Sequence, residues 1–150
     1  MVVVGAGAED VREKLQDLPV RIVDNPDWAE GMGSSIRYGI SALSAETDCV
    51  VIALCDQPRI TPALLADLAK RHFETGAPIV ASSYDGVIGA PCAFGTSLFP
   101  ALAALKGDAG ARDLIRNSPV PVETVPFGGG ILDVDTPEDI RLLMPDAYKD

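Results

Sequence analysis

The chain has 150 residues, of which 47% are hydrophobic and 23% are charged, a composition typical of a single globular domain. Its 22 Asp and Glu residues outnumber its 12 Lys and Arg residues, which gives a formal net charge of −10. Most of such a surface would repel a polyanion, so we expect no nucleic acid among the partners. No apolar run approaches the length of a bilayer span, which argues against a membrane partner.

The three cysteines, Cys49, Cys55 and Cys92, include no C-x-x-C pair. An odd count without that spacing fits neither a disulfide framework nor a zinc site. Cys49 and Cys55 flank an apolar run, and we expect both to be small buried side chains. Together these features predict a cytoplasmic protein with reduced thiols.

The first third of the chain predicts two short strands and two helices. Residues 2–4 and 20–23 are apolar runs typical of buried strands. Residues 9–18 and 34–43 carry apolar side chains at helical spacing, which predicts a helix over each range.

The middle of the chain contains the strongest strand signal. Residues 49–55 are apolar without alternation, which predicts a central parallel strand covered on both faces. Thr61 can cap the helix that follows, and Pro62 suits its first turn. Residues 79–82 predict another strand, and residues 86–94 an extended segment broken by a glycine and a proline.

The last third continues the alternation of helices and strands. Helices are predicted over residues 97–105 and 108–116 and from Thr136, and strands over residues 122–125 and 131–134. Residues 128–130 are three glycines and predict a flexible turn. The alternation predicts an α/β fold with one mostly parallel sheet and helices on both sides. Ligands of such sheets bind outside the carboxyl ends of the strands.

Two aspartates are the first candidates for chemistry at that edge. Asp56 directly follows the apolar run of residues 49–55, and a carboxylate there can hold Mg²⁺ against substrate phosphates. Asp135 would join it on one metal if their strands are neighbours, whereas Asp133 has the position of a structural residue. The alternative is that Asp56 caps the following loop and that Asp135 or Thr136 caps the last helix.

A glycine-serine segment is the second candidate. Gly31 and Gly33 allow the backbone to approach a ligand closely. Ser34 and Ser35 offer hydroxyl groups and free backbone N–H groups at a helix start. The segment would grip a base, ribose or phosphate; the alternative is that Ser34 is a plain helix cap.

The remaining signals are weaker. Arg112 on the first turn of a helix could clamp an anionic substrate, or form a surface ion pair with Asp108. The tight turn Gly89-Ala90-Pro91 is a weak signal by itself. His72 is the only histidine, so no Ser-His-Asp or Cys-His set can be assembled.

The order of these motifs is more specific than any one of them. They are Asn25-x-x-Trp28-x-x-Gly31-Met32-x-Ser34-Ser35-Ile36-x-x-Gly39, Asp56-Gln57-Pro58, Gly89-x-Pro91, Gly107-Asp108-x-Gly110-Ala111-Arg112 and Asp133-x-Asp135-Thr136-Pro137-Glu138-Asp139. In this order, and over nearly the whole chain, they resemble the MobA-like NTP transferase family. The branch that they resemble most is the molybdenum cofactor cytidylyltransferases.

This resemblance implies a Rossmann-like three-layer sandwich with a mostly parallel sheet, of the nucleotide-diphospho-sugar transferase type. It also implies transfer of a nucleoside monophosphate to a phosphorylated acceptor, with release of pyrophosphate. In the branch named above, CMP passes from CTP to molybdopterin. A different NTP is an alternative donor, and a methylerythritol phosphate or sugar phosphate is an alternative acceptor.

The resemblance also implies the roles of particular residues. It makes Asp56 and Asp135 the catalytic carboxylates that hold Mg²⁺, the expected cofactor. It places the nucleotide near Gly33, Ser34 and Ser35. On the acceptor side it places Gly89, Pro91, Gly107, Asp108 and Arg112.

Members of this family begin with an apolar strand and a glycine-rich loop, with an Arg-Met-Gly triplet and a Lys, that cradles the triphosphate. The sequence has neither ahead of Val2, so we expect residues 1–150 to be one MobA-like domain with the first strand and nucleotide loop absent. Such a chain is a piece of an active enzyme, or a non-catalytic binding or assembly module. A third alternative is a domain completed by another chain at an exposed sheet edge, which predicts a homodimer.

Overall fold

The computed structural model describes residues 1–130 and 132–143. Its strands are β1 (Val2–Val4), β2 (Ile22–Asp24), β3 (Cys49–Ile52), β4 (Ile79–Tyr84), β5 (Val87–Gly95) and β6 (Val122–Pro126). Its α-helices are α1 (Ala8–Leu15), α2 (Met32–Ser41), α3 (Pro62–Thr75), α4 (Phe99–Ala103), α5 (Ala111–Arg116) and α6 (Pro137–Leu143). Two 3₁₀ turns, η1 (Trp28–Glu30) and η2 (Thr96–Leu98), precede α2 and α4.

The strands of the described residues form two sheets rather than the single sheet predicted. One sheet is the parallel pair β1–β2, and the other has the order β3-β5-β4-β6. Within the larger sheet β4 and β6 are parallel, and β5 is antiparallel to both β3 and β4. Because β3, β4 and β6 therefore share one direction, their carboxyl ends lie at the same edge.

β3 differs from the central parallel strand that its apolar run predicts. In the described part of the chain it pairs with β5 alone, and the pairing is antiparallel. Both its faces are nevertheless covered: Val50 and Ile52 pack in one apolar cluster, and Cys49 and Val51 pack in the other. An apolar run therefore indicates that both faces are covered, but not how many strands pair with it.

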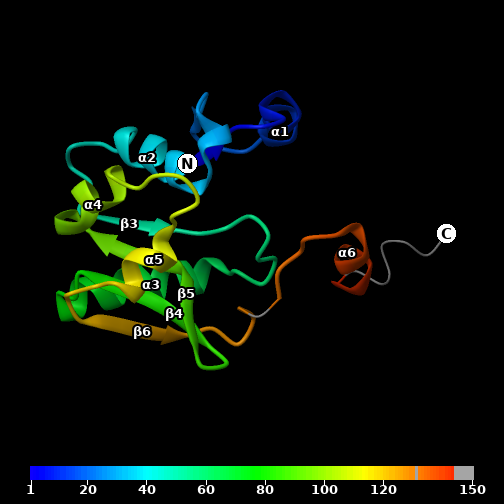
Figure 1. Ribbon diagram of the computed structural model, residues 1–150. Coiled ribbons are helices and arrows are strands. Elements are labelled where there is room, and N and C mark those ends of the chain that lie inside the picture. Colours follow the sequence, from blue (N-terminus) through cyan, green and yellow to red (C-terminus); the bar gives the residue numbers. More distant parts are fainter. Residues whose placement is uncertain (131, 144–150) are drawn as a thin grey trace.

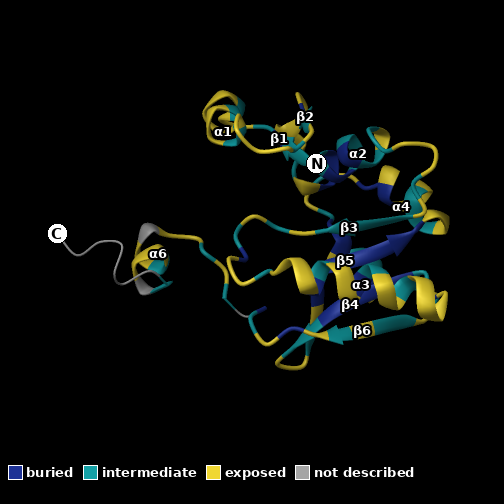
Figure 2. Ribbon diagram, turned by 180° about the vertical axis from the view of Figure 1, so that it is seen from behind, coloured by how far each residue is buried: buried dark blue, intermediate teal, exposed yellow. Residues whose placement is uncertain are grey.

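Helices cover the two faces of the four-stranded sheet, which gives the three layers that were predicted (Figure 1). Figure 2 shows α3 across one face, with buried residues concentrated in the central strands. The apolar cluster on the α3 side contains Leu64, Leu68, Ala77, Val80, Ala93 and Phe127. The cluster beneath α2, α4 and α5 contains Ile36, Ile79, Ala81, Cys92, Phe94, Leu102, Leu105, Ala111 and Ile115.

The predicted start of α3 is confirmed. The Thr61 hydroxyl accepts a hydrogen bond from the Leu64 backbone N–H at 3.2 Å, and Pro62 occupies the first turn. Gly76, at a φ of +68°, ends the helix, and its N–H donates to the His72 carbonyl. Such a left-handed residue satisfies a carbonyl that the last turn would leave open.

Two helices at the ends of the chain are not packed as their sequences predict. α1 has no buried residue, although Val11 and Leu15 lie on its apolar face. α6 stands apart from both sheets (Figure 1), and its apolar residue Ile140 is exposed. No helix among residues 1–130 and 132–143 is both long enough and apolar enough to cross a membrane.

The cysteines occupy three different environments, so the prediction that Cys49 and Cys55 are both buried is wrong. Cys55 is exposed, Cys49 is half-buried and Cys92 is buried. Cys55 lies beyond the last residue of β3, outside the part of the run that packs in the two apolar clusters. Burial raises the pKa of Cys49, and it raises the pKa of Cys92 to about 12.

These environments predict which thiol reacts. At pH 8 we expect Ellman's reagent to modify Cys55 rapidly in the folded protein and Cys92 only after denaturation, because the thiolate is the reactive form. The fast phase should disappear in Cys55→Ser and remain in Cys92→Ser. A fast phase that survives Cys55→Ser would contradict these burials.

Candidate active site

The loop after β3 and the segment before α6 meet at the carboxyl edge of the larger sheet. The Val134 backbone N–H donates a hydrogen bond to the Asp56 carbonyl at 2.8 Å. Asp135 is the next residue, so the two predicted carboxylates belong to adjoining segments. Residues 132–134 form no strand, and residue 131 of the predicted strand lies outside the described residues.

Side-chain oxygens in the β3 loop lack hydrogen-bond donors. Asp56 Oδ1 and Gln57 Oε1 are both buried from solvent and have no partner among residues 1–130 and 132–143. Gln57 is only 5% exposed. A buried acceptor without a donor costs about 1–3 kcal/mol. Two such atoms on consecutive residues mark a place where a water molecule or a bound group would supply the missing partner.

The segment around Asp135 is held by the start of α6. Asp139 Oδ2 accepts hydrogen bonds from the Thr136 N–H and hydroxyl, both at 2.8 Å, and from the Asp135 N–H at 3.2 Å. These bonds, first that from the Thr136 side chain, lower the pKa of Asp139. The backbone of Asp135 is thus fixed while its carboxylate is exposed.

The Gly31–Ser35 and Gly107–Arg112 segments, predicted to serve nucleotide and acceptor, lie against each other. The Gly33 N–H donates to the Gly107 carbonyl at 2.9 Å. A Cβ on Gly33 would lie 2.9 Å from the Lys106 backbone nitrogen. Gly31 has a φ of +106°, and a Cβ there would meet the Asp108 carboxylate and the Gly107 backbone. The glycines are required by this contact between loops.

Ser34 is buried inside a hydrogen-bond network rather than open to a ligand. Asn25, which is 2% exposed, donates through Nδ2 to Ser34 Oγ at 2.8 Å and to Ser35 Oγ at 3.0 Å. The Ser34 hydroxyl donates to the Gly31 carbonyl at 2.8 Å. Ser35 is half-buried, and its hydroxyl proton has no acceptor among the described residues. Of the two serines, Ser35 retains a donor for a ligand.

Gly89 and Pro91 lie within β5 rather than in a turn that breaks the strand. The pairing register passes from Ala81 opposite Cys92 to Ser82 opposite Gly89, which leaves Ala90 and Pro91 as a bulge. Proline lacks a backbone N–H, and a bulge removes the need for one. Pro91 is buried, and its carbonyl accepts a hydrogen bond from the Ser82 hydroxyl at 2.7 Å.

Two of the three glycines after β6, Gly129 and Gly130, are packed against other segments, which differs from the flexible turn predicted, whereas Gly128 is exposed. A Cβ on Gly129 would lie 2.6 Å from Arg59 Cβ, and one on Gly130 would lie 2.5 Å from Tyr84 Cγ. The Tyr84 ring also packs edge-to-face against Phe127, with 6.1 Å between centroids. Tyr84 therefore contacts both Phe127 and Gly130, which precede Asp135 in the chain.

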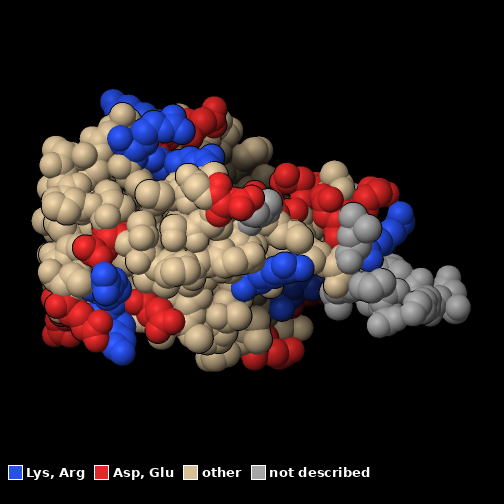
Figure 3. All heavy atoms as spheres, turned by 90° about the horizontal axis from the view of Figure 1, so that it is seen from below, with Lys and Arg blue, Asp and Glu red and all other residues tan. Residues whose placement is uncertain are grey.

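Arg112 is exposed on the first turn of α5, and no ion pair to Asp108 is formed among the described residues. On the face drawn in Figure 3, basic side chains form separate groups with acidic ones nearby. That face presents no continuous basic surface.

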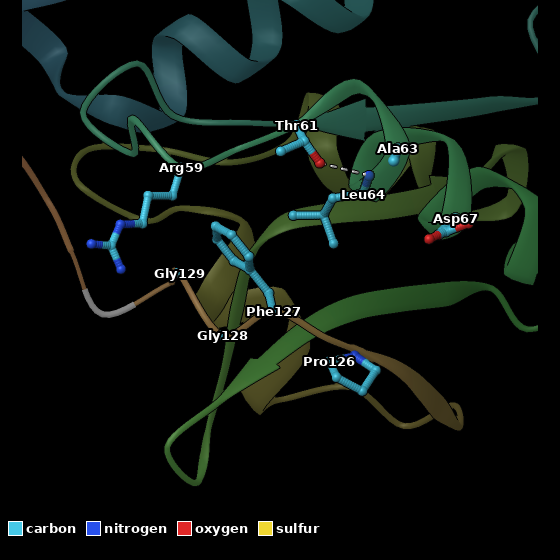
Figure 4. Close-up of a pocket in the computed structure, with 9 residues that line it drawn as sticks. All are labelled: Arg59, Thr61, Ala63, Leu64, Asp67, Pro126, Phe127, Gly128 and Gly129. Carbon is cyan, nitrogen blue, oxygen red and sulfur yellow. Dashed lines mark hydrogen bonds between the residues drawn. The ribbon is translucent and has the colours of Figure 1, made fainter.

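A shallow, open pocket of about 400 Å³ lies between the start of α3 and the loop after β6 (Figure 4). It is lined by Arg59, Thr61, Ala63, Leu64, Asp67, Pro126, Phe127, Gly128 and Gly129. None of the residues predicted for catalysis or binding is among them. We therefore place the candidate site at Asp56 and Asp135 and not in this pocket.

Sequence reasoning gives no role to Asn25, Gln57 or Tyr84. Asn25 and Gln57 stand inside the quoted motifs, and a buried polar residue beside a strand end is a signal for each. Nothing in the sequence indicates that Tyr84 meets Gly130, because the two are distant in the chain. No group of three or more His, Cys, Asp or Glu residues that could hold a metal occurs in the described ranges.

A two-carboxylate site still fits a divalent cation of the Mg²⁺ type. Mg²⁺ binds through one or two protein carboxylates and keeps waters or substrate phosphates as its other ligands. Asp56 supplies an oxygen without a donor, and Asp135 supplies an exposed carboxylate on the adjoining segment.

Comparison with known proteins identifies relatives of the whole arrangement. The model of the MobA-like NTP transferase domain matches residues 1–122. A protein named nicotine blue oxidoreductase from Paenarthrobacter nicotinovorans is 34% identical over an alignment of 152 residues. The alignment covers 96% of this chain and 74% of that protein.

Solved structures agree with this relationship. The Rv0371c homologue of Mycobacterium sp. strain JC1 has a TM-score of 0.78 and 30% identity, over 96% of this chain and 72% of that chain. Rv0371c of Mycobacterium tuberculosis H37Rv, solved in complex with manganese, has a TM-score of 0.71 and 27% identity, over 96% of this chain and 76% of that chain. The 4-diphosphocytidyl-2C-methyl-D-erythritol synthase of Anaerococcus prevotii has a TM-score of 0.70, over 97% of this chain and 76% of that chain. At 16% identity, this likeness shows only that the two share the nucleotide-diphospho-sugar transferase fold. The chain belongs to the MobA-like NTP transferase family.

Proposed function

We propose that the chain transfers a nucleoside monophosphate, CMP from CTP, to a phosphorylated acceptor such as molybdopterin and releases pyrophosphate. The observation that supports this best is the hydrogen bond from the Val134 N–H to the Asp56 carbonyl, because it joins the segments of Asp56 and Asp135. Family membership supplies the reaction class. The choice of CTP and of molybdopterin rests on the likeness of the motifs to the cytidylyltransferase branch.

In this proposal Asp56 and Asp135 hold the divalent cation, with Mg²⁺ as the expected metal. When bound, the cation would neutralise the charge that develops on the phosphates during transfer. The Ser35 hydroxyl donates a hydrogen bond to the nucleotide. Gly33 and Ser34 shape the loop that carries Ser35. This refines the prediction that all three contact the nucleotide, since Ser34 is buried and the Gly33 N–H is engaged.

The acceptor side is proposed at the neighbouring loops. Arg112 attracts the anionic acceptor, because a planar guanidinium matches phosphate geometry. Gly107 and Asp108 hold the loop that leads to α5, and Gly89 and Pro91 shape the bulge at the sheet edge. Phosphoryl transfer depends mainly on positioning and charge neutralisation, so residues of this kind can account for the reaction.

Calorimetric titration of CTP, GTP and ATP, each with and without Mg²⁺, tests the proposal. We expect binding of CTP that requires the metal, and a loss of at least about tenfold in Asp56→Asn, the loss typical of even outer-shell residues of metal sites. Asp67→Asn is the matched control, because Asp67 is an exposed aspartate on α3.

Each outcome has a definite meaning. Metal-dependent binding of GTP or ATP in place of CTP would keep the reaction class and change the donor. Binding that Asp56→Asn leaves unchanged would contradict the metal site. A folded protein that binds none of the three nucleotides and is a stable dimer would favour a non-catalytic assembly module.

A further inference from the structure

We infer that Gln57 is a positioning residue whose side-chain oxygen accepts a hydrogen bond from a water molecule on the cation held by Asp56. This inference rests on the metal site of the proposed function. It assigns to Gln57 a part that neither family membership nor the relatives' names supply.

The side chain of Gln57 is buried, but among the described residues its oxygen is unsatisfied. Its Oε1 atom is buried and has no hydrogen-bond partner in the part of the chain that the structure describes, and the residue as a whole is 5% exposed. A carboxamide oxygen has two acceptor sites, and a buried one is normally satisfied. The side chain is therefore not explained by a structural contact of its oxygen.

The main chain of the loop after β3 is held by backbone hydrogen bonds. The backbone carbonyl of Gln57 accepts a hydrogen bond from the Ile60 N–H at 3.2 Å, and that of Asp56 accepts one from the Val134 N–H at 2.8 Å. The main chain of both residues is thus fixed by its own bonds. Their side-chain oxygens are free to serve a bound group without loosening the loop.

A hydrated divalent cation would satisfy the side-chain oxygens of both Asp56 and Gln57. Asp56 Oδ1 is also a buried acceptor without a partner, directly beside Gln57 in the chain. A Mg²⁺ or Mn²⁺ ion satisfies a carboxylate oxygen directly and retains water ligands, which are strong hydrogen-bond donors. Such waters need acceptors in the surrounding shell, and those acceptors tune metal affinity. A neutral carboxamide oxygen suits that role.

The inference makes stability and metal affinity change in opposite directions. In Gln57→Met the side chain keeps its length but loses the oxygen, so the metal-free protein no longer buries an unsatisfied acceptor. We expect its thermal midpoint in EDTA to equal or exceed that of the wild type. We expect its affinity for Mn²⁺, measured by calorimetry or by electron paramagnetic resonance, to fall by about 10–100-fold.

Two further variants complete the experiment. Gln16→Met is the matched control, because Gln16 is exposed and distant in sequence from Asp56. This control variant should change neither the thermal midpoint in EDTA nor the affinity for Mn²⁺. Gln57→Glu keeps the acceptor and adds a negative charge beside Asp56, so its midpoint should fall in EDTA and rise more on addition of Mn²⁺ than that of the wild type.

The outcomes separate this inference from the proposed function. Unchanged Mn²⁺ affinity in Gln57→Met, with Asp56-dependent binding in the wild type, would overturn the role of Gln57 and leave the metal site standing. A lower midpoint in EDTA with unchanged affinity would make Gln57 a structural residue. If Gln57→Met fails to fold, a folded Gln57→Glu with no gain from Mn²⁺ overturns the inference. No Mn²⁺ binding by the wild type would overturn both proposals.

Discussion

Gly31→Ala is expected to lower the free energy of unfolding by about 2–5 kcal/mol, because it combines backbone strain with a clash. Gly31 has a φ of +106° and a ψ of −173°, a conformation that residues with a Cβ rarely adopt. The added Cβ would also lie 2.7 Å from the Gly107 carbonyl carbon, which cannot move without its loop. Chemical denaturation followed by circular dichroism measures the change.

Gly128→Ala provides the comparison for that variant. A Cβ on Gly128 would meet nothing within 4 Å, and its φ is not positive. Its unfolding free energy should therefore stay within about 0.5 kcal/mol of the wild type. Nucleotide binding should weaken in Gly31→Ala, because the loops of Ser35 and Arg112 meet there. Equal stability of the two alanine variants would mean that the loops do not pack as described.

Local features of the chain could be predicted well where side chains alone decide them. The cap at Thr61 and the first-turn proline determine where α3 begins, and both are visible in the sequence. The apolar run before Asp56 correctly indicates that both faces of β3 are covered. It could not reveal that, among the described residues, β3 pairs with a single antiparallel neighbour, because a continuous apolar run reports burial of both faces and not the number or direction of the paired strands.

The candidate site was only partly predictable for a similar reason. The sequence places Asp56 and Asp135 at the ends of two segments, but it does not show the hydrogen bond between Val134 and Asp56 that joins those segments. A serine at a helix start is a common ligand contact, yet the Ser34 hydroxyl is buried and accepts a hydrogen bond from Asn25, which follows β2. Contacts between distant segments decide both points, and no local pattern encodes them.

The contact between Tyr84 and Gly130 yields the second large expected effect. A Cβ on Gly130 would lie 2.5 Å from Tyr84 Cγ and 2.7 Å from Tyr84 Cε1, so Gly130→Ala must displace the ring or the loop. The loop leads directly to Asp135. We expect unfolding free energy to fall by about 1–3 kcal/mol, as in other overpacked sites, and metal-dependent nucleotide binding to fall at least about tenfold.

A second substitution distinguishes displacement of the loop from a general loss of stability. Tyr84→Ala removes the ring that the new Cβ would meet, so the double variant Gly130→Ala/Tyr84→Ala should bind nucleotide more tightly than Gly130→Ala alone. It should also be less stable than the wild type, because the contact between the Tyr84 and Phe127 rings is lost. Additive losses of binding in the double variant would contradict this account. Recovery of binding on deletion of an aromatic ring cannot come from better packing, so it would show that the position of the loop before Asp135 controls the site.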